Sequence, residues 1–329
     1  MSVDEAPRAV AGAARSGAGV AAAADVARVS APTEQRNPRT LDIDVVPTLQ
    51  VLRLINGEDH LVAPAVERVL PLLAVAVDLA VAALRAGHRV HYFGAGTSGR
   101  LGVLDAAELP PTYSLPPDRV VAHHAGGVDA LVGAVEAAED DEPAGAREAH
   151  RAVRAGDVVV GLTASGRTPY VGGALRAARG IGAATVLVSA HPEAPLAALA
   201  DVHVGVDTGP EAVAGSTRMK AATAQKLVLN AFSTAVMVRT GRTWSNLMVA
   251  VSATNAKLRG RLERILAEAT GLDDATVARA LTAADGDLQV ALVSLLARVA
   301  PASARAALDA HGSVREAVAA LAVDPPPTG

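Results

Sequence analysis

The stretch from His91 to Pro111, HYFGAGTSGRLGVLDAAELPP, constrains the fold more than any other part of the chain. A short apolar run ends at Phe93, a glycine-rich turn follows it, and an apolar helical pattern then runs to Glu108. This order predicts a strand, a tight turn and a helix. A turn of this kind presents backbone N–H groups to an anion, and the helix dipole adds to the attraction.

Further apolar runs and helical patterns extend this unit along the chain. Strands are predicted at 88–93, 119–123, 157–162, 184–189 and 202–206. Helices are predicted between and after them, at 98–108, 129–139, 169–180, 194–200 and 216–240. Strands that alternate with helices of about 10–15 residues indicate βαβ units. The sequence therefore predicts an α/β fold built on a parallel sheet.

The segments on either side of this alternation differ in character. Residues 1–32 are rich in Ala, Gly and Val without the continuous apolar core of a secretory signal, and we expect a disordered leader there. Two helices are predicted at 46–56 and 62–86, the second apolar on nearly all sides and so buried between layers or in a subunit contact. Residues 33–270 would form the α/β domain with these N-terminal helices, 274–323 a small bundle of three helices, and 324–329 a loose tail.

Composition excludes several classes of protein. The 329 residues include no Cys, which excludes disulfides, thiolate catalysis and Cys-ligated metals. The net charge is −4, and the many arginines form no basic block with interleaved aromatics, so no nucleic-acid partner is expected. No apolar run reaches the roughly 18 residues of a membrane span. We therefore expect a cytoplasmic protein with no membrane partner.

Three polar loops follow predicted strands, where ligands bind in open α/β sheets. They are residues 94–99 (GAGTSG), residues 163–169 (TASGRTP), and residues 209–225, which lead into the long helix. The first loop alone could be an ordinary turn and the second only a capped helix start, but two such Ser/Thr/Gly-rich loops after different parallel strands favour a ligand site. No acidic residue at the expected strand end supports a dinucleotide site. The candidate substrate- or phosphate-binding residues are Gly96, Thr97, Ser98, Ser165, Gly166, Thr168, Glu211, Ser216 and Lys220.

Two glutamates are candidate acid–base groups. Glu108 ends its predicted helix, where the dipole disfavours a negative charge, as suits a general acid. Glu139 opens an acidic run in which neighbouring like charges hinder ionisation. From the residues alone, a solvated helix end explains Glu139 better than a catalytic role does. For Glu108 the two explanations are about equally good. The pair His123–His124 has no third ligand at metal-binding spacing, so no metal site is predicted.

Longer stretches carry a family resemblance. They are TEQRNPRTLDID from Thr33, INGEDHLVAPAVE from Ile55, YFGAGTSGRLGVLDAAELPPTY from Tyr92, AVEAAEDD from Ala134, DVVVGLTASGRTPYVGGAL from Asp157, GPEAVAGSTRMKAATAQKLVLN from Gly209 and NLMVAVSATNAKL from Asn246. In these stretches the chain resembles the N-acetylmuramic acid 6-phosphate etherases. The resemblance covers residues 33 to about 270 and continues more weakly in ADGDLQVALV. Leu109 stands where the family often has Cys, a departure outside the proposed catalytic positions.

The resemblance implies a flavodoxin-like sheet of the sugar isomerase (SIS) type, a homodimer with sites near the subunit interface, and no metal, nicotinamide or other cofactor. It implies cleavage of the lactyl ether of N-acetylmuramic acid 6-phosphate in peptidoglycan recycling. By similarity Glu108 is the acid for lactate departure and Glu139 the base at C2, while the loop from Ser165 to Thr168, with Thr97 and Ser98, binds the 6-phosphate.

Two other functions share this fold. A sugar-phosphate-binding regulator such as the glucokinase regulatory protein resembles the family without being an enzyme, but acidic residues at both Glu108 and Glu139 favour catalysis. An aldose–ketose isomerase is less favoured, because the AEDD and GPE segments resemble those of the etherases.

Overall fold

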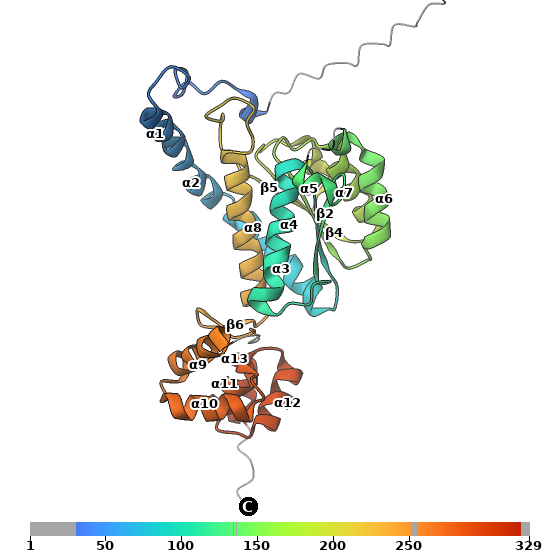
Figure 1. Ribbon diagram of the computed structural model, residues 1–329. Helices are drawn as coiled ribbons and strands as arrows, with labels where there is room; N and C mark the ends of the chain where they lie inside the picture. Colours follow the sequence, from blue (N-terminus) through green and yellow to red (C-terminus); the bar gives the residue numbers. More distant parts are fainter. Residues whose placement is uncertain (1–30, 134, 136, 252–255, 324–329) are drawn as a thin grey trace, which may run out of the picture. The chain divides into compact units, whose positions relative to one another are not determined.

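The computed structural model of the chain describes residues 31–133, 135, 137–251 and 256–323 (Figure 1). The predicted tail and all but the last two residues of the predicted leader lie outside the described residues. No single helix in the described ranges is long and apolar enough to cross a membrane; α10 (Asp274–Ala283) and α11 (Leu288–Ala297) meet that test only as a pair bent by 116°.

A five-stranded parallel sheet forms the centre of the described α/β part. Its strands are β1 (Val90–Gly94), β2 (Val120–His124), β3 (Val158–Thr163), β4 (Ala184–Ser189) and β5 (Val202–Gly205). They lie in the order β2-β1-β3-β4-β5, and every neighbouring pair is parallel. This is the flavodoxin-like order, so the predicted α/β fold and parallel sheet are confirmed.

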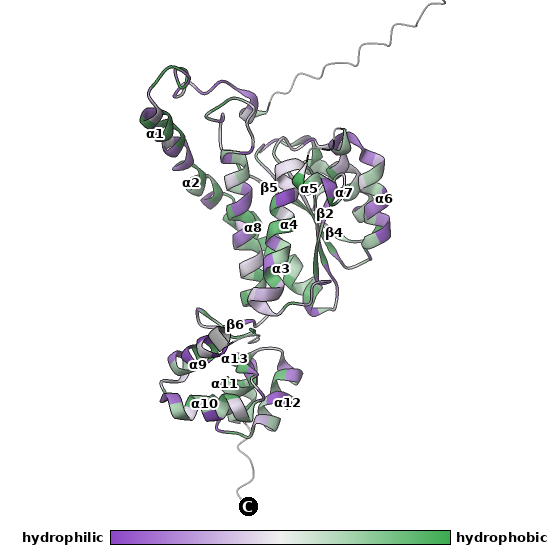
Figure 2. Cartoon of the chain, in the orientation of Figure 1, coloured by the Kyte–Doolittle hydropathy of each residue, from purple (hydrophilic) through white to green (hydrophobic). Residues whose placement is uncertain are grey.

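Helices cover both faces of the sheet because both faces are apolar. On one face Val90 and Tyr92 pack in a core with α3 (Leu70–Arg85), α4 (Gly96–Tyr113) and α8 (Lys220–Arg239). On the other face Phe93 packs with α6 (Glu142–Ala152) and α7 (Pro169–Ile181). Figure 1 shows α4 and α8 on one side of the strands and α6 and α7 on the other. In Figure 2 α3 is mostly green and α6 carries more purple, in keeping with a buried and a solvent-facing helix.

Several predicted helices have different bounds. The apolar segment 62–86 is two helices, α2 (Val62–Glu67) and α3, because Pro71 in the first turn of α3 has no N–H to continue the earlier helix. The predicted helix 129–139 is wrong: α5 (Asp129–Val132) ends at the extended Gly133, and a 3-10 turn, η2 (Ala138–Asp140), precedes the unpredicted α6. The predicted helix 194–200 is the 3-10 turn η3 (Pro195–Leu199).

The predicted end of α4 at Glu108 is also wrong. The helix continues to Tyr113 with Pro110 and Pro111 inside it. Each proline removes a backbone hydrogen bond. Leu109 is buried in the core and Tyr113 packs against it, so burial of this last turn offsets the lost bonds.

The remaining helices lie before and after the sheet. A 3-10 turn, η1 (Pro32–Glu34), precedes α1 (Thr48–Asp59). After α8, the short antiparallel strands β6 (Thr243–Trp244) and β7 (Leu247–Met248) lead to α9 (Ala256–Thr270). Within the described residues, 273–323 forms four helices in place of the predicted three: α10, α11, α12 (Pro301–His311) and α13 (Val314–Val323). They enclose a separate apolar core centred on α11.

Candidate functional site

The strand order creates a switch point between β1 and β3. From β1 the chain passes through α4 to β2 on one side, whereas from β3 it passes through α7 to β4 on the other. Gly94 at the end of β1 is the register partner of Leu162 in β3. The loops after these two strands therefore leave neighbouring strand ends in opposite directions. In open α/β sheets this divergence forms the crevice that binds ligands.

The first loop is a glycine turn pressed against the strand end. A Cβ at Gly94 would lie 2.8 Å from the Cα of Gly99, and a Cβ at Gly99 would lie 2.6 Å from the carbonyl oxygen of Gly94. Gly96 opens α4 with a φ of +53°, a conformation that disfavours side chains. Thr97 and Ser98 follow in the first helical turn. The N-terminal N–H groups of an 18-residue helix thus lie at the carboxyl end of β1, where an anion site is expected in such a fold.

His124 supports this turn from the end of β2. Its Nε2 lies 3.1 Å from the carbonyl oxygen of Gly96, and its Nδ1 lies 2.8 Å from that of Ala125. The buried ring of His124 therefore fixes the glycine turn through these two contacts. In the described part of the chain no group of three or more His, Asp or Glu residues is arranged to hold a metal ion.

The second loop, residues 163–168, is folded by its own hydroxyl groups. The Thr163 and Thr168 hydroxyl oxygens lie 2.9 Å apart, and the backbone N–H of Gly166 donates to Thr163 Oγ1 at 3.2 Å. Gly166 has a φ of +72°, and Ala194 fills the space that its Cβ would need. The Ser165 hydroxyl accepts from the backbone N–H of Arg167 at 3.4 Å, which leaves its own hydrogen to donate. A phosphate in the crevice would meet this hydroxyl and the first turn of α7.

Glu139 lies at the same edge of the sheet as the second loop. It is exposed in η2, which contacts α7, and Asp141 then caps α6 by accepting the Ala144 N–H at 2.8 Å. Because α6 leads back into β3, it runs antiparallel to the strands and begins at their carboxyl ends. The two helices pack so closely that a Cβ at Gly173 would collide with the carbonyl oxygen of Glu142. The structure thus holds the Glu139 turn beside α7, the helix that follows the second loop.

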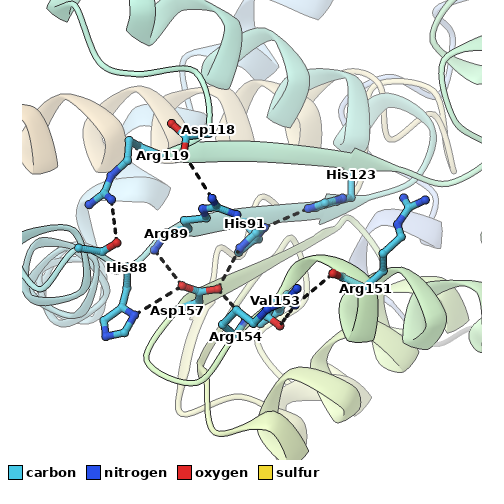
Figure 3. A network of polar contacts seen from close by, with 11 residues as sticks. His88, Arg89, His91, Asp118, Arg119, His123, Arg151, Val153, Arg154 and Asp157 are labelled. Atoms are coloured by element: carbon cyan, nitrogen blue, oxygen red, sulfur yellow. Dashed lines mark hydrogen bonds and ion pairs between the residues drawn. The ribbon is translucent and has the colours of Figure 1, made fainter.

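A largely buried chain of polar side chains, with Glu148 partly exposed, ties α7 to α6 and the sheet. The Tyr170 hydroxyl donates to Glu148 Oε2 at 2.6 Å, and Glu148 Oε1 lies 3.2 Å from His123 Nδ1. His123 Nε2 lies 3.0 Å from His91 Nδ1, and His91 Nε2 lies 3.3 Å from Asp157 Oδ2. Figure 3 shows His91 between Asp157 and His123. The chain runs through the interior from the beginning of β3 to the first turn of α7.

Two groups in this polar chain have shifted pKa values. Burial and the neighbouring His123 lower the pKa of His91 to about 4. Burial raises the pKa of Glu148, but hydrogen bonds from His123 and Tyr170 outweigh it and leave the pKa below its usual value.

Glu108 lies apart from this edge. It is twelve residues beyond Gly96 on α4, and at a rise of about 1.5 Å per residue this is about 18 Å along the helix. Its side chain is exposed, one turn after Leu104, which is 44% exposed. Because α4 continues to Tyr113, Glu108 does not occupy the helix end on which its predicted acidity rested. The structure brings Glu139 and the two loops together, but it does not bring Glu108 to them.

The helix that carries Glu108 is fixed by a buried carboxylate. Asp105 accepts hydrogen bonds from the Tyr92 hydroxyl and the Ser233 hydroxyl, both at 3.0 Å. Burial raises the pKa of Asp105, and these two hydrogen bonds oppose the increase. Asp105 therefore joins α4 to β1 and α8, and it sets the position of Glu108 three residues later.

In the third loop the acidic residue, Glu211, has a structural role. Glu211 is fully buried, and its two oxygens accept the backbone N–H groups of Lys220 and Ala221 at 2.9 and 3.0 Å. Burial raises the pKa of Glu211, and the two amide hydrogen bonds oppose the increase. The first amides of a helix have no partners within the helix, and a carboxylate also suits the dipole. Glu211 thus caps α8 instead of facing a ligand, whereas Ser216 is partly exposed in the loop before α8.

Lys220 is also engaged away from the crevice. Its side chain is 1% exposed and its ammonium lies 2.6 Å from Glu58 Oε2, and the Arg39 guanidinium binds both oxygens of the same carboxylate. A buried ammonium needs a carboxylate partner, because desolvation of an unpaired charge is costly. This ion triad gives Lys220 a partner within the fold, and its role in binding the substrate stays a prediction.

Sequence analysis did not single out Glu58, Asp105, Glu148 or Tyr170. Their burial and pairing depend on residues far away in the chain, which no local pattern reveals. The one available signal in the sequence was the rarity of tyrosine, because the chain has only three. Two of them, Tyr92 and Tyr170, are buried with a carboxylate on the hydroxyl.

The chain is similar to known families, proteins and solved structures over the region that contains this site. A family model of the glucokinase regulatory protein N-terminal SIS domain matches residues 72–179, and a model of the SIS domain matches residues 140–235. The chain is 64% identical over 273 residues to an N-acetylmuramic acid 6-phosphate etherase of Thermobifida fusca, covering 83% of this chain and 90% of the relative. It is 54% identical over 267 residues to an etherase of the same name from Symbiobacterium thermophilum, covering 81% and 89%. A solved phosphoheptose isomerase of Francisella tularensis aligns with a TM-score of 0.46 and 17% identity over 58% of this chain and 98% of that chain.

Proposed function

The chain belongs to the N-acetylmuramic acid 6-phosphate etherase family, and from this premise we propose that it cleaves the D-lactyl ether of N-acetylmuramic acid 6-phosphate by elimination and addition of water. The products are N-acetylglucosamine 6-phosphate and D-lactate, and the enzyme is a carbon–oxygen lyase. The crevice between β1 and β3 carries the proposal, because two anion-binding loops meet there beside an exposed carboxylate.

Each proton transfer in the proposed reaction is assigned to a residue of this chain. In the open-chain sugar the aldehyde acidifies the C2 hydrogen, and Glu139 removes it as a proton. The C3–O bond then breaks, Glu108 protonates the departing lactate oxygen, and a C2=C3 double bond forms. Water adds across that bond, placing hydroxyl at C3 and hydrogen at C2. Both glutamates act through proton transfer alone.

The 6-phosphate would be held by the two loops at the switch point. The first turn of α4 offers backbone N–H groups with the hydroxyls of Thr97 and Ser98, and the second loop offers the Ser165 hydroxyl, with Gly166 giving the loop its turn. Thr168 lies at the start of α7, whose dipole also favours an anion. Glu211 and Lys220 would act indirectly, by fixing the start of α8.

The wider setting is part of the same proposal. The enzyme would work as a homodimer in the cytoplasm, on amino sugars recovered from peptidoglycan. Residues 33–270 would bind and convert the sugar phosphate, and the helices of 274–323 would support assembly instead of chemistry.

Isotope exchange tests the assignment of the two glutamates. In heavy water, Glu108→Ala should lose D-lactate release but still exchange the C2 hydrogen of N-acetylglucosamine 6-phosphate, because its base is intact. Glu139→Ala should lose release and exchange together, each by at least about 10²–10⁴-fold. Exchange that survives only in Glu139→Ala would reverse the roles. A wild-type chain that binds the sugar phosphate without releasing lactate would instead be a binding protein.

A further inference from the structure

Arg167 in the second loop has a charged side chain that the described residues leave without a partner. Its Nε is buried, and no hydrogen-bond acceptor for it lies within reach in the described ranges. A guanidinium stays charged in proteins, and its N–H groups can only donate. A buried donor without an acceptor costs free energy, because the hydrogen bond that it made to water is not replaced. The residue is partly exposed, so an anionic ligand can approach it from solvent.

The other cations in or beside the three loops are already paired or hydrated. Arg100 donates from Nε and Nη2 to three backbone carbonyl oxygens. Lys220 is buried against Glu58, and Arg218 is exposed, so water satisfies its guanidinium. Among the loop cations that the structure describes, Arg167 alone combines a buried donor with the lack of an acceptor. It is therefore the cation of these loops that gains most from binding an anion.

The proposed substrate carries two anionic groups. Its 6-phosphate is already assigned to the hydroxyls and the first helical turns of the first two loops. The carboxylate of its lactyl group has no partner in that assignment, and the product N-acetylglucosamine 6-phosphate lacks this group. A residue that binds the carboxylate would therefore distinguish the substrate from its own product. The Nε of Arg167 is a suitable donor, because Nε and one Nη of a guanidinium can bind both oxygens of a carboxylate in parallel.

The spacing between the two anionic groups fits the reach of this side chain. Eight bonds join the phosphorus to the carboxyl carbon of the lactyl group, which is about 10 Å in an extended chain at about 1.2 Å per bond. Six bonds join the Cα of Arg167 to the tip of its guanidinium, about 7 Å on the same scale, and a hydrogen bond adds about 3 Å. The backbone N–H of Arg167 donates to Ser165 Oγ at 3.4 Å, so the side chain starts from the turn that would hold the phosphate. With the phosphate at Ser165, the guanidinium can therefore reach the carboxylate at the far end of the same sugar.

We propose that Arg167 binds the lactyl carboxylate and so selects the lactyl ether over other sugar 6-phosphates. This inference rests on the proposed etherase function and adds to it a residue for the second charge of the substrate. Arg167 would hold the carboxylate that leaves with the lactate, and it would transfer no proton. A hydrogen bond between charged groups is strong enough to change an affinity by at least about tenfold. The same residue contributes nothing to a sugar phosphate that has no carboxylate.

Paired changes in the residue and in the ligand test the proposal. In the Glu139→Ala background, isothermal titration would compare N-acetylmuramic acid 6-phosphate with its lactyl amide, which keeps the shape of the group without its charge. With Arg167 present, the acid should bind at least about tenfold more tightly than the amide. With Arg167→Leu, the two ligands should bind within about twofold of each other, because the cation that distinguishes them is gone. Arg167→Lys keeps the charge without the planar fork and should give an intermediate ratio.

Turnover gives a second measurement in chains that keep Glu139. Arg167→Leu should lower kcat/KM for D-lactate release by at least about tenfold, chiefly through KM. Exchange of the C2 hydrogen of N-acetylglucosamine 6-phosphate in heavy water should keep its KM, since that sugar has the phosphate but no carboxylate. The matched control Arg218→Leu removes the same charge from an exposed position in the third loop. It should leave the preference for the acid over the amide unchanged.

The outcomes separate the inference from the function. If Arg167→Leu weakens the acid, the amide and N-acetylglucosamine 6-phosphate equally, Arg167 binds the phosphate or only holds the loop, and the inference is overturned. A preference for the acid that survives in Arg167→Leu, or that is lost in Arg218→Leu, overturns it too. If Arg167→Leu does not fold, the wild-type chain decides, because equal affinity for acid and amide refutes a carboxylate site. A wild-type chain that releases no lactate overturns the proposed function, and the titrations still show whether Arg167 binds the carboxylate.

Discussion

Replacing Glu58 by Gln should reveal how much stability the buried ion triad provides. The Glu58 carboxylate lies 2.6 Å from the ammonium of Lys220, whose side chain is 1% exposed, and it binds the guanidinium of Arg39 through both oxygens. Glutamine keeps the shape of the side chain but removes the charge. The change leaves a buried ammonium without a counter-ion, whereas Arg39 is half exposed and can be solvated.

The shifted pKa of Glu58 gives the size of the expected loss in the free energy of unfolding. Hydrogen bonds from Arg39 and Lys220, acting against burial, lower this pKa from 4.5 to about 2. At about 1.36 kcal/mol per pKa unit, the carboxylate contributes about 3 kcal/mol to the free energy of unfolding near neutral pH. Removing one partner of a buried pair costs about 3–5 kcal/mol, which agrees. Because the folded-state pKa is the lower one, this stability is present above pH 4.5 and is lost as the pH falls toward 2.

Urea unfolding followed by circular dichroism at pH 7 and pH 3 measures both effects. Glu58→Gln should lose about 3 kcal/mol at pH 7 and show a smaller further loss at pH 3 than the wild-type chain does. The double variant Glu58→Gln/Lys220→Met should recover part of the loss, since no unpaired charge is left. A cost below about 1 kcal/mol at pH 7, with an unchanged acid dependence, would refute a buried and charged Glu58.

Four further changes have distinct expected outcomes. Ser165→Ala removes a hydroxyl donor worth roughly 1.5–3 kcal/mol to a charged acceptor, so KM for the phosphorylated sugar should rise about tenfold or more; an unchanged preference for phosphorylated over unphosphorylated sugar would contradict this. Tyr170→Phe should raise the same KM and lower kcat more than Tyr92→Phe does at equal loss of thermal stability, because Tyr170 ties to α6 the helix that follows the proposed phosphate-binding loop; steady-state kinetics with matched melting curves decides it. Glu211→Gln should cost about 1–3 kcal/mol in urea unfolding, because an amide cannot accept both N–H groups of the α8 terminus. A chain ending at Gly271 should form fewer dimers by sedimentation while keeping the same products; a folded dimer without any turnover would show that the last four described helices take part in the chemistry.

The parallel sheet and its crevice could be predicted because they depend on local patterns. Strands such as β3 are continuous apolar runs that glycine and polar turns delimit, and alternation with helices makes them parallel. The GAGTSG and TASGRTP loops follow β1 and β3 directly, so their place at the carboxyl edge follows from the chain order alone. The motifs around Glu108 and Glu139 identified the family for the same reason, because they are contiguous in sequence.

Only the tertiary structure decided which side chains face the crevice. Lys220 carries a charge that suits a phosphate and Glu211 oxygens that suit a sugar hydroxyl, but burial forces each to satisfy a nearer partner, Glu58 or the α8 amides. The prolines after Glu108 predicted a helix end, yet the burial of Leu109 carries α4 past them and leaves Glu108 on an outer surface. Local sequence fixes the residues a strand or loop contains, whereas burial and long-range pairing, which involve residues far apart in the chain, fix what each side chain contacts.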